Sequence, residues 1–203
     1  MKFLLAALAA LALALAAGTP AQAAADVAAS VHRYVVESSA PPSTQGKAQA
    51  TDASLGVHWL RSYTSVDKSK TYSLYEAPNR GAMRQAATLN GLPVTAINEA
   101  PVDLDSESDA RTGNLPAGMH RYMIERTFPE GALDGLDSAT KAKVNATNSK
   151  FGAQWVTSYA NDGKTRTYCI YNATDEAAVR AAAKANGLPV DKITEVPLTA
   201  RAR

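Results

Sequence analysis

The sequence predicts an α+β protein made of two ferredoxin-like βαββαβ domains that pack as a pseudo-dimer. One block occurs twice, from Trp59 to Val102 and from Trp155 to Leu198, with about 20 of 44 positions identical at a constant offset of 96 residues. Each copy joins short β-type runs to an Ala-rich helical stretch. Aromatic residues recur at alternate strand positions and exceed what one helical layer covers. We therefore expect the two open sheet faces to pack together, as in a dimeric α+β barrel.

The first segment, residues 1–23, is predicted to be a signal peptide. Lys2 precedes an unbroken run of Leu, Ala and Phe, and Ala21-Gln22-Ala23 offers a small-x-small cleavage site. The run is shorter than the ~20 apolar residues of a membrane-spanning helix. We expect a periplasmic or secreted mature protein that starts near Ala24 and has no membrane association after the signal is removed.

The first domain is expected over residues 31–104. Its elements should be a strand at 32–37, a shortened helix at about 47–55, strands at 57–65 and 71–77, a helix at 79–90, and a strand at 94–102. Pro78 and Asn79 suit the start of the helix, because Asn accepts hydrogen bonds from free N–H groups. Gly91 provides a left-handed stop, and Pro93 prevents continuation.

An acidic linker is expected over 105–118 and the second domain over 119–200. The elements should be a strand at 120–125, a longer first helix up to about 150, strands at 155–159 and 167–173, a helix at 174–186, and a strand at 190–198. Asp137 or Ser138 should cap the first helix. The Asp162-Gly163 dipeptide between the two middle strands is typical of a hairpin turn.

Composition excludes several classes of function. The formal net charge is +2 with mixed signs, so no basic stripe points to nucleic acid. No nucleophile elbow, phosphate loop, dinucleotide fingerprint or His-Glu-x-x-His sequence occurs. The one cysteine, Cys169, rules out an intramolecular disulfide. A small buried residue is the favoured reading for it, and a thiol ligand or an intermolecular disulfide is the alternative.

Matched polar residues in the first strands are the metal candidates. His32 corresponds to His120, and Glu37 corresponds to Glu125. Imidazole and carboxylate groups brought together near a two-fold axis could bind one metal ion. However, His32 and Glu37 differ by five residues, so they point to opposite faces about 16 Å apart and share a site only through a bulge or the other domain. The alternative for the histidines is an exposed strand start.

The alternative for Glu37 and Glu125 is an ion pair. The nearby cations in the sequence are Arg33, Arg121 and Arg126.

Matched tyrosines are the candidates for a ligand pocket between the sheets. They are Tyr63, Tyr159, Tyr75 and Tyr171. Packing in the core or between the domains is the alternative for all four.

The second copy resembles the DUF4242 family. The resemblance rests on residues 122–126, Phe128-Pro129-Glu130-Gly131, and the segments 155–159, 167–173, 183–189 and 193–196; the first copy lacks the Phe-Pro-Glu-Gly segment. The resemblance implies a small ferredoxin-like domain that dimerises. Some relatives are described as nickel-binding, which implies nickel or another divalent transition metal as a cofactor. Relatives carry a histidine at the end of the second helix, where this chain has Asn90 and Asn186.

These observations favour an exported protein that binds a small ligand or a metal ion. A cofactor-free enzyme with a pocket between the sheets is the first alternative, with Tyr and Glu as acid–base groups. A structural or interaction protein is the second. No assembled catalytic constellation is recognisable, so catalysis is not predicted. Further oligomerisation beyond the intramolecular pseudo-dimer is left open.

Overall fold

A computed structural model describes residues 31–41, 52–108 and 115–202. The expected signal peptide at 1–23, residues 47–51 of the expected short helix and residues 109–114 of the expected linker lie outside these ranges. In the described ranges, no helix has the length and apolar character needed to cross a membrane.

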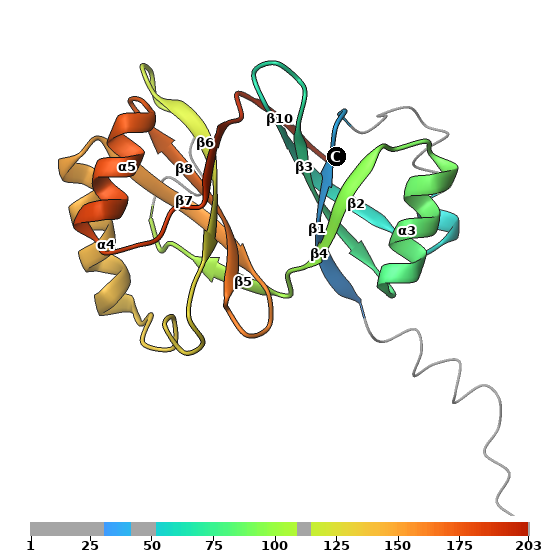
Figure 1. The fold of residues 1–203 in the computed structure, drawn as a ribbon, viewed down its shortest axis with the longest axis horizontal. Helices are drawn as coiled ribbons and strands as arrows, with labels where there is room; N and C mark the ends of the chain where they lie inside the picture. The colour runs from blue at the N-terminus through green and yellow to red at the C-terminus, as the bar shows by residue number, and fades with distance from the viewer. Residues whose placement is uncertain (1–30, 42–51, 109–114, 203) are drawn as a thin grey trace, which may run out of the picture. The chain divides into compact units, whose positions relative to one another are not determined.

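The first sheet has five strands in the order β10-β2-β3-β1-β4, with antiparallel neighbours (Figure 1). Its strands are β1 (His32–Ser38), β2 (His58–Thr64), β3 (Thr71–Ala77), β4 (Val94–Glu99) and β10 (Leu198–Arg201). The first four follow the ferredoxin-like order that the sequence predicts.

The second sheet repeats this arrangement in the order β5-β7-β8-β6-β9. Its strands are β5 (Val102–Asp105), β6 (His120–Thr127), β7 (Ala153–Ala160), β8 (Arg166–Ala173) and β9 (Lys192–Glu195). A β-bulge interrupts the pairing of β2 with β3 after Trp59, and the same bulge follows Trp155 in β7. Each indole N–H donates to a serine hydroxyl three residues later, at 2.8 Å and 2.9 Å, which ties down the bulge in both repeats.

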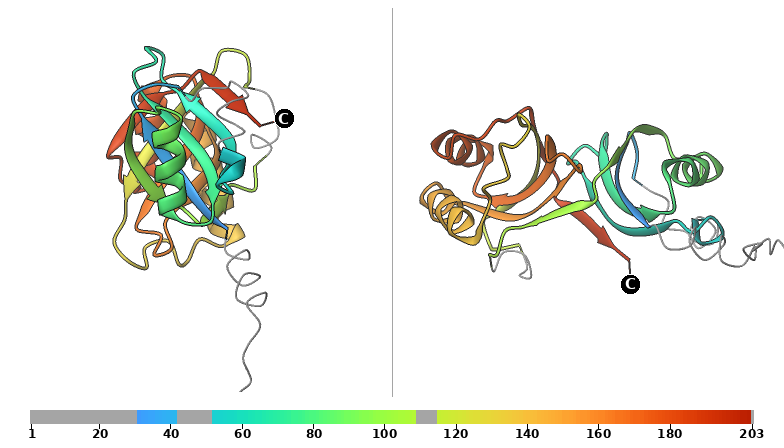
Figure 2. Two further views of the ribbon diagram at one scale, coloured as in Figure 1. Left: turned by 90° about the vertical axis from the view of Figure 1, so that its right-hand side faces the viewer. Right: turned by 90° about the horizontal axis from the view of Figure 1, so that it is seen from below.

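Three long helices cover the outer faces of the two sheets (Figure 2). They are α3 (Arg80–Leu89), α4 (Ser138–Lys150) and α5 (Glu176–Ala185). Asn79, Asp137 and Asp175 accept hydrogen bonds from backbone N–H groups at the respective helix starts. The predicted stop at Gly91 is present, since this residue has positive φ, and Gly187 has the same conformation at the matched position. Where α4 lies in the second repeat, the described part of the first repeat has a single helical turn at 52–54.

The last strand of each repeat differs from the prediction of one continuous strand at 94–102 and at 190–198. In the first repeat, the hydrogen bonds to the first strand end with the Ala100 N–H, which donates to the backbone carbonyl of Arg33 at 2.8 Å. In the second repeat, they end with the Val196 N–H, which donates to the backbone carbonyl of Arg121 at 2.7 Å. The next residues, Pro101 and Pro197, have no N–H to extend these ladders. The chain instead crosses to the other sheet, where β5 pairs with β7 and β10 pairs with β2. Each sheet is therefore completed by a strand of the other repeat.

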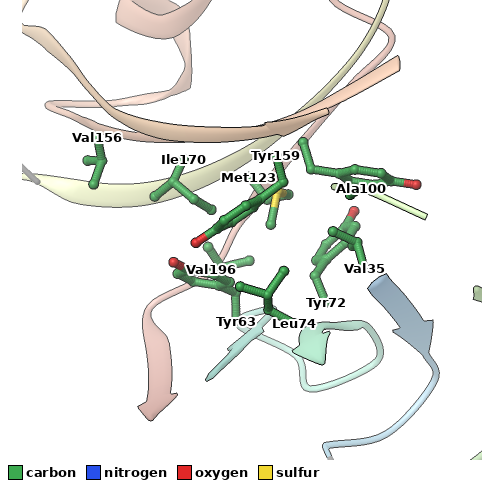
Figure 3. Packing of buried hydrophobic residues seen from close by; sticks show 11 residues of the cluster. Val35, Tyr63, Tyr72, Leu74, Ala100, Met123, Val156, Tyr159, Ile170 and Val196 are labelled. Carbon is green, nitrogen blue, oxygen red and sulfur yellow. The ribbon is translucent and has the colours of Figure 1, made fainter. Parts of the chain in front are cut away.

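The two sheets pack face to face around a shared apolar core (Figure 3). Eleven buried residues from both repeats make up this inter-sheet core: Val35, Tyr63, Tyr72, Leu74, Ala100, Met123, Val156, Tyr159, Tyr168, Ile170 and Val196. Two further clusters lie beneath the helices, one on each sheet. Alternation along the strands sorts the side chains, so Val35 faces the other sheet while its neighbours Tyr34 and Val36 face the helix. The predicted α+β pseudo-dimer is thus confirmed.

Candidate functional site

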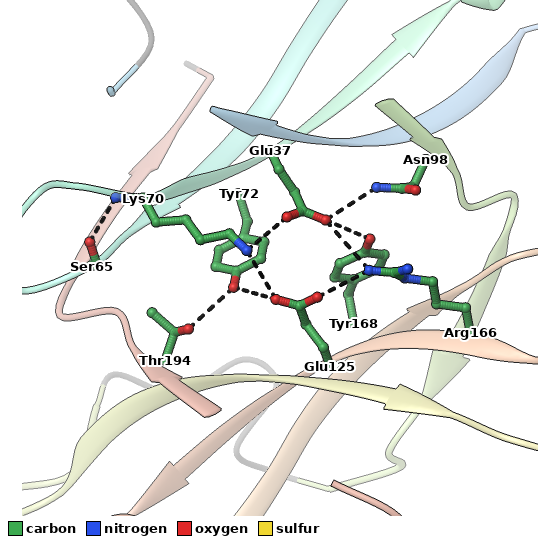
Figure 4. Close-up of polar contacts among 9 residues, drawn as sticks. All are labelled: Glu37, Ser65, Lys70, Tyr72, Asn98, Glu125, Arg166, Tyr168 and Thr194. Carbon is green, nitrogen blue, oxygen red and sulfur yellow. Dashed lines mark hydrogen bonds and ion pairs between the residues drawn. The ribbon is translucent and has the colours of Figure 1, made fainter. Parts of the chain in front are cut away.

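Glu37 and Glu125 meet between the two sheets at one margin of the inter-sheet core (Figure 4). Glu37 lies near the end of β1 and Glu125 lies at the matching place on β6. They are 7% and 8% exposed, an unusual degree of burial for carboxylates, which are almost never buried unless paired. The pseudo-two-fold relation between the repeats therefore brings two glutamates into one cluster.

Two cations neutralise this pair of carboxylates. The Lys70 Nζ atom lies 2.7 Å from Glu37 Oε2 and 3.1 Å from Glu125 Oε1. The Arg166 Nη2 atom lies 3.1 Å from Glu125 Oε2 and 3.7 Å from Glu37 Oε1. Lys70 and Arg166 occupy matched positions, Lys70 directly before β3 and Arg166 as the first residue of β8. Both cations contact both carboxylates, so the cluster is electrically balanced.

Two tyrosines complete the cluster by reaching across from one sheet to the other. The Tyr72 hydroxyl donates to Glu125 at 2.7 Å, and the Tyr168 hydroxyl donates to Glu37 at 2.8 Å. The lysine lies over one of these rings, with Nζ 4.5 Å from the centroid of Tyr72. Each hydrogen bond joins two repeats that are far apart in sequence, so the cluster fastens the sheets together as well as satisfying the buried carboxylates.

Neutral residues on the last strands provide the remaining partners. Asn98 donates to Glu37 at 3.2 Å, while Thr194, at the equivalent position, lies 3.2 Å from the Tyr72 hydroxyl.

The environment shifts several pKa values within this cluster. Burial alone would raise the pKa of Glu125, but hydrogen bonds from Tyr72 and Lys70 outweigh it and hold that pKa below its usual value. Burial raises the pKa of Tyr72 to about 12. The pKa of Lys70 is raised because its bonds to the carboxylates outweigh the effect of burial. At neutral pH Glu125 and Lys70 are thus charged, and the Tyr72 hydroxyl is a hydrogen-bond donor.

The partners of the two glutamates differ from the arginines suggested by the sequence. Arg33 instead pairs with Asp103 and with Glu76. Arg126 is 2% exposed, donates to the carbonyl of Pro189 and lies over the ring of Tyr171.

Arg121, the third candidate, binds Asn172 at 3.1 Å. All three arginines are therefore occupied elsewhere.

The structure keeps the two candidate histidines apart from the glutamates. His32 shares its strand face with Tyr34, on the helix side of the first sheet, and His120 shares its face with Tyr122 on the second. The His32 Nδ1 atom lies 2.6 Å from Glu99 Oε1. The histidines are consequently not joined in one site, and neither contacts Glu37 or Glu125 in the described contacts.

The second histidine has the same partner as the first. The His120 Nδ1 atom lies 2.7 Å from Glu195 Oε1, and Glu195 matches Glu99.

The four candidate tyrosines divide between two environments. Tyr63 and Tyr159 belong to the inter-sheet core. Tyr75 and Tyr171 lie beneath the helices of their own repeats. The two pairs therefore do not line a common pocket, because alternate strand positions face opposite sides of each sheet.

A metal centre needs several ligating side chains grouped at one place. Throughout the described ranges, no three or more side chains of His, Cys, Asp or Glu are grouped so that they could hold a metal ion. Cys169 is buried on the helix side of its sheet, with its sulfur 3.2 Å from the Thr167 hydroxyl. A metal between Glu37 and Glu125 would have to displace the bound Lys70 and Arg166 groups. The described side chains thus do not form a complete metal site.

A pocket of about 240 Å³ opens beside the glutamate cluster. Three members of the cluster line it, Asn98, Arg166 and Tyr168, together with Arg80, Glu99 and Asn161. Because cluster residues line this pocket, a small polar molecule in it would reach the margin of the cluster.

Four residues of the cluster were not among the predicted site residues, although the repeat contains a pattern that indicates them. Lys70 and Arg166, and Tyr72 and Tyr168, are matched across the repeat at the same offset as the other identities. In each repeat a matched cation lies at the end of the hairpin turn, two residues before a matched tyrosine, and this pattern could have predicted them.

Comparisons with known proteins identify a family for both repeats. A family model described as "Nickel responsive protein SCO4226-like" matches residues 34–100 and 122–196, more than half of the chain. Among curated proteins no match was found. These two segments confirm a duplicated domain of a nickel-related family.

Solved structures show only remote similarity. Chlorite dismutase from Candidatus Nitrospira defluvii in complex with imidazole is 7% identical, with 85% of this chain and 91% of that chain covered and a TM-score of 0.42. An anthrone oxidase-like protein is 13% identical, with 84% and 93% covered and a TM-score of 0.35. Similarity at this level carries no conclusion about function.

Proposed function

Because the chain belongs to the family of nickel responsive proteins similar to SCO4226, we propose that it is an exported binding protein whose ligand is a divalent transition metal, with nickel as the first candidate. The observation that carries the proposal is the pair of matched His–Glu contacts, His32 with Glu99 and His120 with Glu195.

In each pair the carboxylate engages one imidazole nitrogen and leaves the other available. The His32 and His120 side chains are 41% and 52% exposed, and their contacts with described residues involve Nδ1. A carboxylate on Nδ1 orients the ring and makes Nε2 a better ligand, as in many metal sites. Imidazole nitrogen also suits nickel. The proposal therefore places one metal ion at each histidine, with the remaining ligands supplied by water or another molecule.

The glutamate cluster is a less suitable place for the metal. Glu37 and Glu125 are oxygen ligands already neutralised by Lys70 and Arg166. Breaking a buried ion pair by removing one partner costs about 3–5 kcal/mol. We therefore assign to Glu37 and Glu125 the role of joining the two repeats.

Equilibrium dialysis of the mature, tag-free protein with Ni²⁺, Cu²⁺ and Zn²⁺ tests the proposal. We expect binding to be lost in the double variant His32→Ala/His120→Ala and retained in Glu37→Gln/Glu125→Gln. His58→Ala is the matched control, because His58 is the remaining histidine and is exposed. Absence of binding at micromolar metal, or equal binding by the double variant and wild type, would exclude this function.

A second candidate is a small polar molecule in the 240 Å³ pocket, either bound or converted without a cofactor. The observation favouring it is that the pocket opens onto Arg166 and Tyr168, two members of the glutamate cluster. Native mass spectrometry and elemental analysis after gentle purification separate the candidates. A retained organic molecule would support binding in the pocket, and a retained metal would support binding at the histidines. If the protein retains no ligand of either kind, the result supports a purely structural or interaction protein.

Export is part of the proposal and rests on residues 1–23. Fractionation of cells that produce the full chain, with N-terminal sequencing, should find the protein outside the cytoplasm and starting near Ala24. A cytoplasmic protein that retains residues 1–23 would contradict export.

A further inference from the structure

Two arginines lie directly opposite each other on neighbouring strands of the first sheet. Arg61 of β2 pairs in register with Arg201 of β10, the strand contributed by the second repeat. Like charges at directly opposite positions of an antiparallel pair are destabilising. Arg61 donates to the Tyr63 hydroxyl at 3.1 Å, a neutral partner. Two positive side chains therefore lie at directly opposite positions of two neighbouring strands.

A third arginine, Arg121, lies on the face of β6 that meets the first sheet, because it is two residues from Met123 of the inter-sheet core. Burial lowers the pKa of Arg121, and the positive charges of Arg201 and Arg61 lower it further. Its hydrogen-bond partner is the neutral side chain of Asn172, at 3.1 Å. Within the described ranges, no carboxylate forms an ion pair with Arg61, Arg121 or Arg201. Burial alone would lower the pKa of Arg61, but interactions with Tyr63, Tyr159 and Asp103 outweigh it and raise that pKa. Asp103 is itself paired with Arg33.

The equivalent place in the other repeat is neutralised by acids. There the arginine equivalent to Arg121 is Arg33, which pairs with Glu76 and Asp103. Glu76 occupies the register position of Asn172, and Asp103 occupies that of Thr199. At the equivalent place, two carboxylates thus neutralise the positive charge of the arginine.

The charge difference continues along the exchanged strands. Asp105 of β5 is paired with Thr157, and the equivalent pair in the first sheet is Arg201 with Arg61. At the site of the three arginines, Asn172 and Thr199 thus stand where the equivalent place has Glu76 and Asp103. Arg201 and Arg61 stand where it has Asp105 and Thr157. The result is three arginines on the inner faces of the two sheets, none of which forms an ion pair with a carboxylate of the described residues.

Hydroxyl groups lie beside the three arginines. Tyr63 and Tyr159 are buried, and Figure 3 shows their hydroxyl oxygens on the same side of the inter-sheet core. Thr199 pairs with Tyr63 and adds a third hydroxyl-bearing residue. Guanidinium groups bind carboxylate and phosphate oxygens through two parallel hydrogen bonds, and hydroxyl groups can donate to the remaining oxygens.

We propose that Arg61, Arg121 and Arg201 form a binding site for a small oxyanion, the carboxylate or phosphate group of a low-molecular-weight ligand. The site lies in the first sheet and its facing strand β6, where the exchanged strand β10 completes it. It is separate from the histidine pairs and from the glutamate cluster, so its occupancy does not depend on a metal.

Isothermal titration calorimetry on the mature protein tests the site, with inorganic phosphate in one arm and malonate in the other. Low ionic strength is needed because salt screens exposed charges. We expect saturable binding of at least one anion, weakened about 10-fold by Arg201→Gln or by Arg121→Gln, the effect of losing one charge-assisted contact. The arm that binds more tightly identifies the ligand group as phosphate or carboxylate.

Arg180→Gln is the matched control. Arg180 is an exposed arginine on α5 that pairs with Glu176, and the substitution changes the net charge by the same amount. It should leave anion affinity unchanged. Equal weakening in Arg180→Gln and Arg201→Gln, or no saturable binding of either anion, would overturn the proposal. Arg201 is exposed, so its variant should fold, and circular dichroism checks that it does.

Discussion

Replacing Glu125 with glutamine tests whether charge holds the two repeats together. Glutamine keeps the size of the side chain and an oxygen that can accept from Tyr72, but it removes the negative charge. The lost charge leaves Lys70, at 3.1 Å, and Arg166, at 3.1 Å, with weaker contacts. A hydrogen bond to a charged group contributes about 1.5–3 kcal/mol, and partial exposure of both cations reduces this. We expect Glu125→Gln to lower the free energy of unfolding by ~2 kcal/mol at pH 7.

The effect should depend on pH in a definite direction. The pKa of Glu125 is held below its usual value in the folded protein. Its stabilisation is therefore fully present above the ordinary glutamate pKa of about 4.3 and is lost as the pH falls through the lower folded value. The difference between wild type and variant should be constant from pH 7 to about pH 5 and should shrink below that.

Urea unfolding followed by tryptophan fluorescence measures this difference, since Trp59 and Trp155 report on one repeat each. A loss of ~2 kcal/mol corresponds to a decrease in Tm of about 4–8 °C for a protein of this size. Glu176→Gln is the control, because it breaks an exposed pair with Arg180 and should change stability by less than about 0.5 kcal/mol. A difference that stays the same from pH 7 to pH 3.5, or a variant as stable as wild type at pH 7, would refute the reasoning.

Three further substitutions test the core, a buried acid and a strained turn, each by urea unfolding. Ile170→Ala empties part of the fully buried inter-sheet core and should lower stability by about 3–4 kcal/mol; a loss below 1 kcal/mol would show that the sheets repack. Asp52→Asn copies Asn148 of the second repeat and should raise stability at pH 7 by about 0.5–1 kcal/mol, because burial raises the pKa of Asp52; a gain that persists at pH 3 would contradict this cause. Gly152→Ala should cost about 1–2 kcal/mol, because φ is +69° and a Cβ would lie 3.2 Å from Thr174; a neutral result would show that the turn adapts.

Local sequence signals were sufficient for most of the secondary structure. The repeat, the helix caps at Asn79 and Asp137 and the stop at Gly91 each depend on residues close in sequence. The order of strands within each repeat follows from the same signals.

The faces of the strands required the tertiary structure. Tyr63 and Tyr75 are both matched strand tyrosines, yet one faces the other sheet and one faces a helix. Periodicity shows that two faces exist but does not show which partner each face meets, and the bulge after Trp59 shifts the alternation once more.

The candidate sites follow the same division. The pairing of the repeats, the match of Glu37 with Glu125 and the opposite strand faces of His32 and Glu37 could all be predicted from the chain's repeat and alternation. Only the tertiary structure showed that Tyr168 donates to Glu37 across 131 residues of sequence.

The exchange of β5 and β10 was likewise decided in three dimensions. It places Arg201 opposite Arg61 although the two residues are far apart in the chain. Pro101 and Pro197 interrupt strands that were predicted to be continuous, and the sheet that the chain joins after each proline depends on which open edge lies nearby. Contacts between distant segments depend on how the two sheets pack, and local propensity carries no information about that packing.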